Sequence, residues 1–139
     1  MERVIISIVI SEQPPRPPLV LVVDDYEDTR IIYAESLRFA GFEVAEAANG
    51  QDAIDIAARI RPDLVVMDLA MPVMDGWEAT RRLKADPTTR SIPIMAVTGH
   101  SNGDHLRRAE QAGCDAFYSK PILPQQLISR IKTCLAGAA

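Results

Sequence analysis

Five polar residues of this chain could together bind a cation and a phosphoryl group, and each of them follows a short apolar block. The blocks and the residues that follow them are Leu19–Val23 with Asp24 and Asp25, Leu64–Met67 with Asp68, Ile94–Val97 with Thr98, and Ala116–Ser119 with Lys120. Such blocks indicate strands that are buried on both faces of a parallel sheet. Because the carboxyl ends of these strands share one edge of the sheet, where ligands bind, we expect the five side chains to converge there.

The chemistry of this set points to phosphoryl transfer. Asp24, Asp25 and Asp68 would repel one another in a cleft unless a cation joined them, and hard oxygen ligands suit Mg²⁺. Lys120 adds a permanent positive charge, and Thr98 adds a neutral hydroxyl donor. Together they would hold an anion with several oxygens beside a carboxylate, which describes a phosphoryl group on its way to Asp68.

Each of these residues also has a plain structural explanation. Asp24 or Thr98 could cap the helix that follows it, Asp25 could be a solvated loop acid, Lys120 could pair with a surface acid, and Asp68 could cap a turn. Taken one at a time, these explanations are the stronger ones. The placement of all five residues at strand ends favours the functional interpretation of the set.

The segments between the apolar blocks have helical periodicity, so the chain alternates strands with helices. We expect a further strand at Phe42–Ala47 and helices at Gln51–Ile60, Gly76–Lys84, Asp104–Ala112 and Pro124–Leu135. The first helix should end before Gly41 and turn Ile32, Tyr33, Leu37 and Ala40 inward. This order predicts an α/β fold with a doubly wound, five-stranded parallel sheet and five helices in a single domain.

Length and composition narrow the function classes. The chain has 139 residues and a net charge of −4 without a basic stripe, which argues against direct binding of nucleic acid. Its apolar run Val4–Ile10 is too short to span a bilayer and lacks the features of a signal peptide, so we expect no membrane association and a cytoplasmic location. Cys114 and Cys134 have no metal-ligand spacing and are expected to be reduced, buried thiols.

Residues 1–18 are expected to lie outside the domain, which would comprise residues 19–139. The stiff spacer Pro14–Pro18 separates Val4–Ile10 from the first strand. The leader is expected to be disordered, with an added edge strand or a docking segment as the alternatives.

Four short motifs contain the candidate residues, and they occur in a defined order. They are Asp24-Asp25, Asp68 with the following Met71–Gly76, Thr98-Gly99, and Phe117–Pro121. Their residue types and spacing closely resemble those of the receiver domain of two-component response regulators. The resemblance covers the chain from Leu19 to about Leu135.

The resemblance implies a role for each residue of the site. Asp68 would accept a phosphoryl group from a sensor histidine kinase or a histidine phosphotransfer protein. Asp25, assisted by Asp24 through water, would bind Mg²⁺ together with Asp68 and the backbone carbonyl of Ala70. Lys120 would contact the phosphoryl oxygens.

The resemblance also implies a switch. Thr98 would move to bond the phosphoryl group, and Phe117 would then turn inward, whereas Tyr118 would face the other side of the sheet. The Lys120-Pro121 bond would be cis. The surface made by residues 104–112, 116–119 and 124–135 would present the change to a downstream protein.

The implied function is that of a single-domain response regulator, a monomer or weak dimer that is not an enzyme but assists its own Mg²⁺-dependent phosphorylation and dephosphorylation. The alternative is a phosphate-shuttling intermediate or phosphate sink in a multistep relay. The stretch Ala79–Pro87 with Ile92-Pro93 looks like that of single-domain regulators that control the cell cycle or relay signals.

Three other classes fit the sequence less well. A haloacid-dehalogenase-type phosphatase needs an acid two residues after its nucleophile, where this chain has Ala70. An FMN-binding flavodoxin-like protein would meet repulsion between phosphate and Asp24-Asp25. The third class is a fragment of a DNA-binding regulator or of a hybrid kinase. The sequence ends at Ala136–Ala139 without a basic helix-turn-helix region, so no DNA-binding effector is expected.

Three further residues near the site have no assigned role. His100 and His105 are expected to be surface histidines rather than metal ligands, although His100 could orient water. Trp77 is expected to be a packing or partner-contact residue.

Overall fold

A computed structural model describes residues 16–99 and 102–137 of the chain, and it alternates strands and helices throughout. In these residues the elements are β1 (Leu19–Val23), α2 (Glu27–Phe39), β2 (Glu43–Ala47), α3 (Gly50–Ile60), β3 (Leu64–Met67), α4 (Gly76–Ala85), β4 (Ile94–Thr98), α5 (Gly103–Ala112), β5 (Ala116–Ser119) and α6 (Pro124–Gly137). All the expected strands and helices are present, and the expected bounds differ from these by at most two residues.

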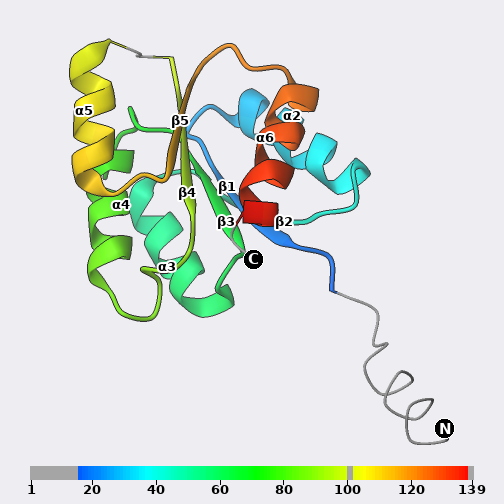
Figure 1. Ribbon diagram of the computed structural model, residues 1–139, viewed down its shortest axis with the longest axis horizontal. Helices are drawn as coiled ribbons and strands as arrows, with labels where there is room; N and C mark the ends of the chain where they lie inside the picture. Colours follow the sequence, from blue (N-terminus) through cyan, green and yellow to red (C-terminus); the bar gives the residue numbers. More distant parts are fainter. Residues whose placement is uncertain (1–15, 100–101, 138–139) are drawn as a thin grey trace, which may run out of the picture.

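The five strands form one parallel sheet in the order β2-β1-β3-β4-β5. Helices α3, α4 and α5 cover one face, and α2 and α6 cover the other (Figure 1). This is the predicted doubly wound arrangement. Its order reverses between β1 and β3, and ligands of open α/β sheets bind at such a point, beyond the carboxyl ends of the strands.

The central strands are buried on both faces because helices cover both. Every residue of β3 and β4 is buried, and residues 20–23 of β1 are as well. Successive side chains of each strand enter opposite layers of the core. Val65 and Met67 pack with α3, α4 and α5, while Leu64 and Val66 pack with α2 and α6.

The predicted inward face of α2 is partly wrong. Tyr33 and Leu37 are buried as expected, but Ile32 is 54% exposed and Ala40 is also exposed. Ala34 takes the inner position instead.

The start of several helices is fixed by polar side chains. Asn49, Asp75 and Asn102 each accept a hydrogen bond from the backbone N–H three residues later, which satisfies a donor that lacks a partner within the helix. Gly113 ends α5 at a φ of 106°, a left-handed conformation that glycine adopts without steric cost.

The expectations for the leader fall on residues 1–15, which lie outside the described residues. In the part that the structure describes, no helix is long and apolar enough to cross a bilayer. Cys114 and Cys134 are free thiols, as expected, but both are half-buried rather than buried.

Candidate functional site

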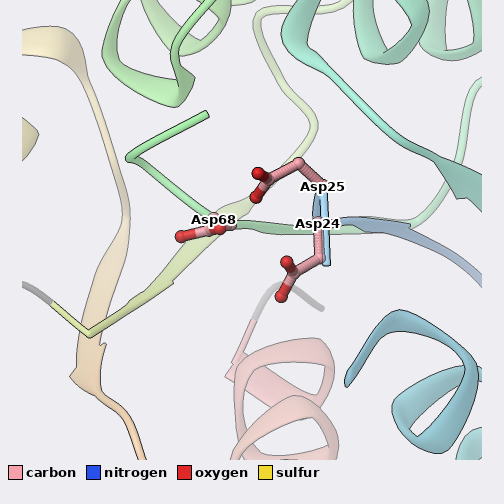
Figure 2. A group of neighbouring side chains, drawn as sticks. All are labelled: Asp24, Asp25 and Asp68. Carbon is pink, nitrogen blue, oxygen red and sulfur yellow. The ribbon is translucent and has the colours of Figure 1, made fainter. Parts of the chain in front are cut away.

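The two central strands place the acidic residues side by side. Val23 of β1 pairs with Met67 of β3, so Asp24 and Asp68 leave the sheet together at its carboxyl edge. The backbone N–H of Asp68 donates to the carbonyl of Val23 at 2.9 Å, which continues this alignment by one residue. The carboxylates of Asp24, Asp25 and Asp68 gather at this edge (Figure 2).

The three acids form a compact cluster, two members of which are buried. One carboxylate oxygen from each of Asp24, Asp25 and Asp68 lies within 4.8 Å of the others. Asp24 is 3% exposed and Asp68 is 8% exposed, whereas Asp25 is exposed. Burial, aided by the charges of Asp24 and Asp25 and opposed by Lys120, raises the pKa of Asp68 to about 7.

Lys120 brings a positive charge into this cluster. Its Nζ atom lies 2.7 Å from Oδ2 of Asp24 and 3.8 Å from Oδ2 of Asp68. Burial acts to lower the pKa of Lys120, but the hydrogen bond to Asp24 and the charges of Asp68 and Asp24 outweigh it, so its pKa is raised above the usual lysine value. The lysine is therefore held as a cation between the two carboxylates.

The predicted switch residues lie on the neighbouring strands. Thr98 is fully buried at the end of β4, and its carbonyl accepts a hydrogen bond from the backbone N–H of Lys120 at 2.8 Å. Phe117 is half-buried and lines a hollow of about 270 Å³ between α5 and β5. Tyr118 packs in the other core layer, with α6, as expected. The Lys120-Pro121 bond is cis, also as expected.

The loop after β3 holds Asp68 close to the start of α4. The backbone N–H of Gly76 donates to the carbonyl of Leu69 at 2.8 Å. A Cβ atom at Gly76 would collide with the backbone oxygen of Asp68 and lie 2.8 Å from Cα of Leu69. This glycine is therefore required by the close approach of α4 to the strand end, a role that the sequence pattern does not show.

One residue of α2 contacts the site and another contacts the segment after Lys120, although no motif singled them out. Nη1 of Arg30 donates to the carbonyl of Asp24 at 3.0 Å, and Nε of Arg30 bonds Glu46 at 3.3 Å. The hydroxyl of Tyr33 donates to the carbonyl of Ile122, three residues past β5, at 3.1 Å. Helical periodicity predicted Tyr33 only as a core residue, because the pattern does not show which atom its hydroxyl bonds.

The expectation for the histidines is tested only at His105, since His100 lies outside the described residues. His105 is half-buried against Trp77, with ring centroids 5.3 Å apart, so its assignment to the surface is wrong. Trp77 is 8% exposed and stacks under the guanidinium of Arg108 at 3.9 Å. It is a packing residue, because α4 and α5 meet at this point.

The residues of the cluster fit a hard divalent cation. They offer only oxygen ligands, and the single charge of Lys120 does not balance three carboxylates. Burial, together with the charges of Asp24 and Asp25, raises the pKa of Asp68, so a further cation here would favour its ionised form. Small oxygen-only sites with room for water suit Mg²⁺.

Comparison with known proteins yields one consistent family. Residues 20–132 match the family model described as the response regulator receiver domain. The polar-differentiation response regulator DivK of Brucella anthropi is 37% identical over 122 residues, which cover 88% of this chain and 99% of that protein.

Solved structures agree with this family. The receiver domain of the sensor histidine kinase PA1611 from Pseudomonas aeruginosa, which holds a magnesium ion in its active-site cleft, has a TM-score of 0.81 and 29% identity, covering 86% of this chain and 98% of that one. The chemotaxis protein CheY4 of Vibrio cholerae has a TM-score of 0.80 and 28% identity, covering 84% and 98%. The chain therefore belongs to the response regulator receiver domain family, whose members act as phosphoacceptors in signalling.

Proposed function

We propose that Asp68 is the phosphoacceptor of this receiver domain and that Asp24, Asp25 and Lys120 complete its site. The observation that carries the proposal is the position of the Asp68 carboxylate, 3.8 Å from the Lys120 ammonium and clustered with the two other acids. In this arrangement three groups lie together at one edge of the sheet. They are the Asp68 nucleophile, the acid cluster that would bind a metal ion, and the Lys120 ammonium that would bind phosphoryl oxygens.

The reaction transfers a phosphoryl group from a histidine nitrogen of the donor protein to a carboxylate oxygen of Asp68. A carboxylate oxygen of Asp68 forms a bond to phosphorus, while the bond from phosphorus to a histidine nitrogen of the donor protein breaks. The electron pair of that bond returns to the imidazole. Lys120 lies where it can bond an oxygen of the arriving phosphoryl group, because it already faces Asp68 from the Asp24 side.

The cluster is proposed to hold Mg²⁺ with carboxylate oxygens of Asp25 and Asp68, with Asp24 acting through water. Both oxygens of Asp24 already have partners, since Oδ1 accepts from the backbone N–H of Tyr26 and Oδ2 bonds Lys120. The carbonyl of Ala70 remains the proposed further ligand. When bound, the ion would neutralise charge on the phosphoryl oxygens.

The switch is proposed to run from Thr98 to Phe117. A phosphoryl dianion on Asp68 attracts the Thr98 hydroxyl as a hydrogen-bond donor and so favours its movement toward the phosphate. The hollow that Phe117 lines offers its ring space between α5 and β5. The surface of α5, β5 and α6 is then the proposed contact for a downstream protein.

The proposed donor is a sensor histidine kinase or a histidine phosphotransfer protein. Similarity to DivK, a polar-differentiation response regulator, supports a regulatory output rather than a shuttle or a phosphate sink. A cytoplasmic location belongs to the same proposal, because free Cys114 and Cys134 suit a reducing compartment.

Incubation with acetyl phosphate and Mg²⁺, followed by intact-mass measurement, tests the proposal. The wild type is expected to gain one hydroxylamine-labile phosphoryl group, and Asp68→Asn or added EDTA should prevent it. Asp55→Asn, the same change at an exposed acid of α3, is the matched control and should react like the wild type. If the wild type forms no adduct with acetyl phosphate or with a phosphorylated histidine protein, the proposal is wrong.

A further inference from the structure

The hydroxyl of Tyr33 joins two parts of the molecule that are distant in sequence. Tyr33 lies on α2 and is 6% exposed, and its hydroxyl donates to the carbonyl of Ile122 at 3.1 Å across 89 positions of the chain. Ile122 belongs to the connection between β5 and α6, two residues after Lys120. The tyrosine therefore ties α2 to the segment that carries the site lysine.

The segment is held at Lys120 and two residues after it. At Lys120 itself, the backbone N–H donates to the carbonyl of Thr98 on β4 at 2.8 Å. Downstream, Ile122 receives the tyrosine hydroxyl. A side chain that must lie between two carboxylates depends on the position of its own backbone, and these two bonds fix that backbone against β4 and α2.

Charged groups of the site also affect the pKa of Tyr33. Burial raises the pKa of Tyr33, and Lys120 acts to lower it, while Asp24 and Asp68 raise it. The geometry agrees with this, since the hydroxyl bonds the carbonyl of Ile122, two residues after the Lys120 that bonds Asp24.

We propose that Tyr33 is a positioning residue for phosphoryl transfer, and that its hydrogen bond to the Ile122 carbonyl holds Lys120 in line with Asp68. The inference rests on the proposed function, because it assigns Lys120 the task of binding the phosphoryl oxygens. Tyr33 itself touches no reacting atom. It acts through the connection between β5 and α6.

The hydroxyl is separable from the packing of the ring. A phenylalanine at this position keeps the contacts with the core layer of α2 and α6 but leaves the Ile122 carbonyl without this donor. The connection between β5 and α6 can then shift until the Ile122 carbonyl finds another hydrogen-bond donor. Since catalysis depends on placement to within a fraction of an ångström, a small shift of Lys120 lowers the transfer rate.

The test compares the phosphorylation rates of Tyr33→Phe and a matched control, using acetyl phosphate and Mg²⁺ with the full chain. Thr89→Val is the control, because Thr89 is 1% exposed and its hydroxyl also donates to a backbone carbonyl, that of Leu83, at 2.7 Å. Thr89 follows the C-terminal end of α4, away from the site. Both variants lose one buried hydroxyl-to-carbonyl bond.

We expect Tyr33→Phe to phosphorylate about three- to ten-fold more slowly than the wild type, with Mg²⁺ affinity changed by less than about two-fold. Thr89→Val should keep the wild-type rate. A double-mutant cycle gives the second readout: in the Lys120→Ala background, Tyr33→Phe should no longer change the rate, because the residue through which it acts is gone.

Three results would overturn the inference. One is an unchanged rate for Tyr33→Phe, and another is an equal loss in Thr89→Val, which would indicate a general effect of stability. The third is an additive effect in the Lys120→Ala background. In each of these cases the wild type still forms its adduct on Asp68, so the proposed function stands; absence of that adduct would overturn both.

Discussion

The Nζ atom of Lys120 lies 2.7 Å from Oδ2 of Asp24, although the two residues are 96 positions apart in the chain. The Asp24 side chain is 4% exposed and the Lys120 side chain is 23% exposed, so the pair is largely shielded from water. Asp68 lies slightly farther from the same ammonium, at 3.8 Å. Without a bound cation, this lysine balances only part of the charge of three acids.

Lys120→Ala is expected to lower the free energy of unfolding by about 2–3 kcal/mol in EDTA, because it leaves the buried Asp24 carboxylate without its partner. Mg²⁺ should restore part of this loss by taking over the charge. Urea unfolding with and without Mg²⁺ measures both effects. Lys132→Ala, at an exposed lysine of α6, is the control and should change neither. An unchanged stability in EDTA would show that the Asp24–Lys120 pair contributes little.

Asp68→Asn is expected to stabilise the metal-free protein at pH 8. The pKa of Asp68 is about 7 in the folded state and 3.8 in the unfolded reference, so the folded protein binds more protons between these values and loses stability as pH rises through 7. A neutral amide removes this loss. We expect a gain of about 2 kcal/mol at pH 8 that shrinks toward pH 4.

Thermal unfolding in EDTA from pH 4 to pH 8 measures this difference. Asp55→Asn provides the matched exposed control and should not stabilise the protein at pH 8. A gain for Asp68→Asn that is constant with pH would contradict the assignment of the effect to titration of Asp68.

Affinity for Mg²⁺ is expected to rise with pH up to about 7 and then level off. Asp68 must lose its proton to become a ligand, so the dissociation constant should fall by up to about tenfold per pH unit below its pKa. Calorimetric titration between pH 5.5 and pH 8 tests this. In Asp68→Asn the affinity should be weaker and the dependence lost; a retained dependence would assign the proton to another group.

Gly76→Ala is expected to destabilise the protein by about 3 kcal/mol and to slow phosphorylation. The added Cβ atom would meet backbone atoms of Asp68 and Leu69, which cannot move aside without displacing the phosphoacceptor. Gly103→Ala is a matched control, because Gly103 also opens a helix after a capping residue but has no atom within 4 Å of the added carbon. Chemical unfolding should separate the two variants, and equal losses would contradict the steric explanation.

Thr98→Ala is expected to leave Asp68 able to accept phosphate while uncoupling Phe117. The hydroxyl that would bond the phosphoryl group is gone, so the Phe117 ring should keep its unphosphorylated environment. NMR of the ring protons measures this, and Tyr118 is an internal control because it packs in the other core layer. A Phe117 response that persists in Thr98→Ala would place the switch elsewhere.

The sequence by itself determined which polar residues follow each strand, and with them most of the residues of the site. Apolar blocks such as Leu64–Met67 are too short for helices. This block lies between Pro62 and Asp68, so the sequence predicted both the strand and its carboxyl end. Because parallel strands share their carboxyl edge, Asp24, Asp68 and Lys120 were expected to converge there. The structure confirms that meeting.

Only the tertiary structure decided which helical residues face the sheet and which reach the site. Helical spacing predicted Ile32 and Tyr33 as inner residues of α2, yet Ile32 is 54% exposed while the Tyr33 hydroxyl ends on Ile122. His105 likewise proved to pack on Trp77. Periodicity predicts which residues share one side of a helix. The rotation of the helix on the sheet, and the atoms that its long side chains contact, depend on the elements packed against it, and the local sequence does not specify these.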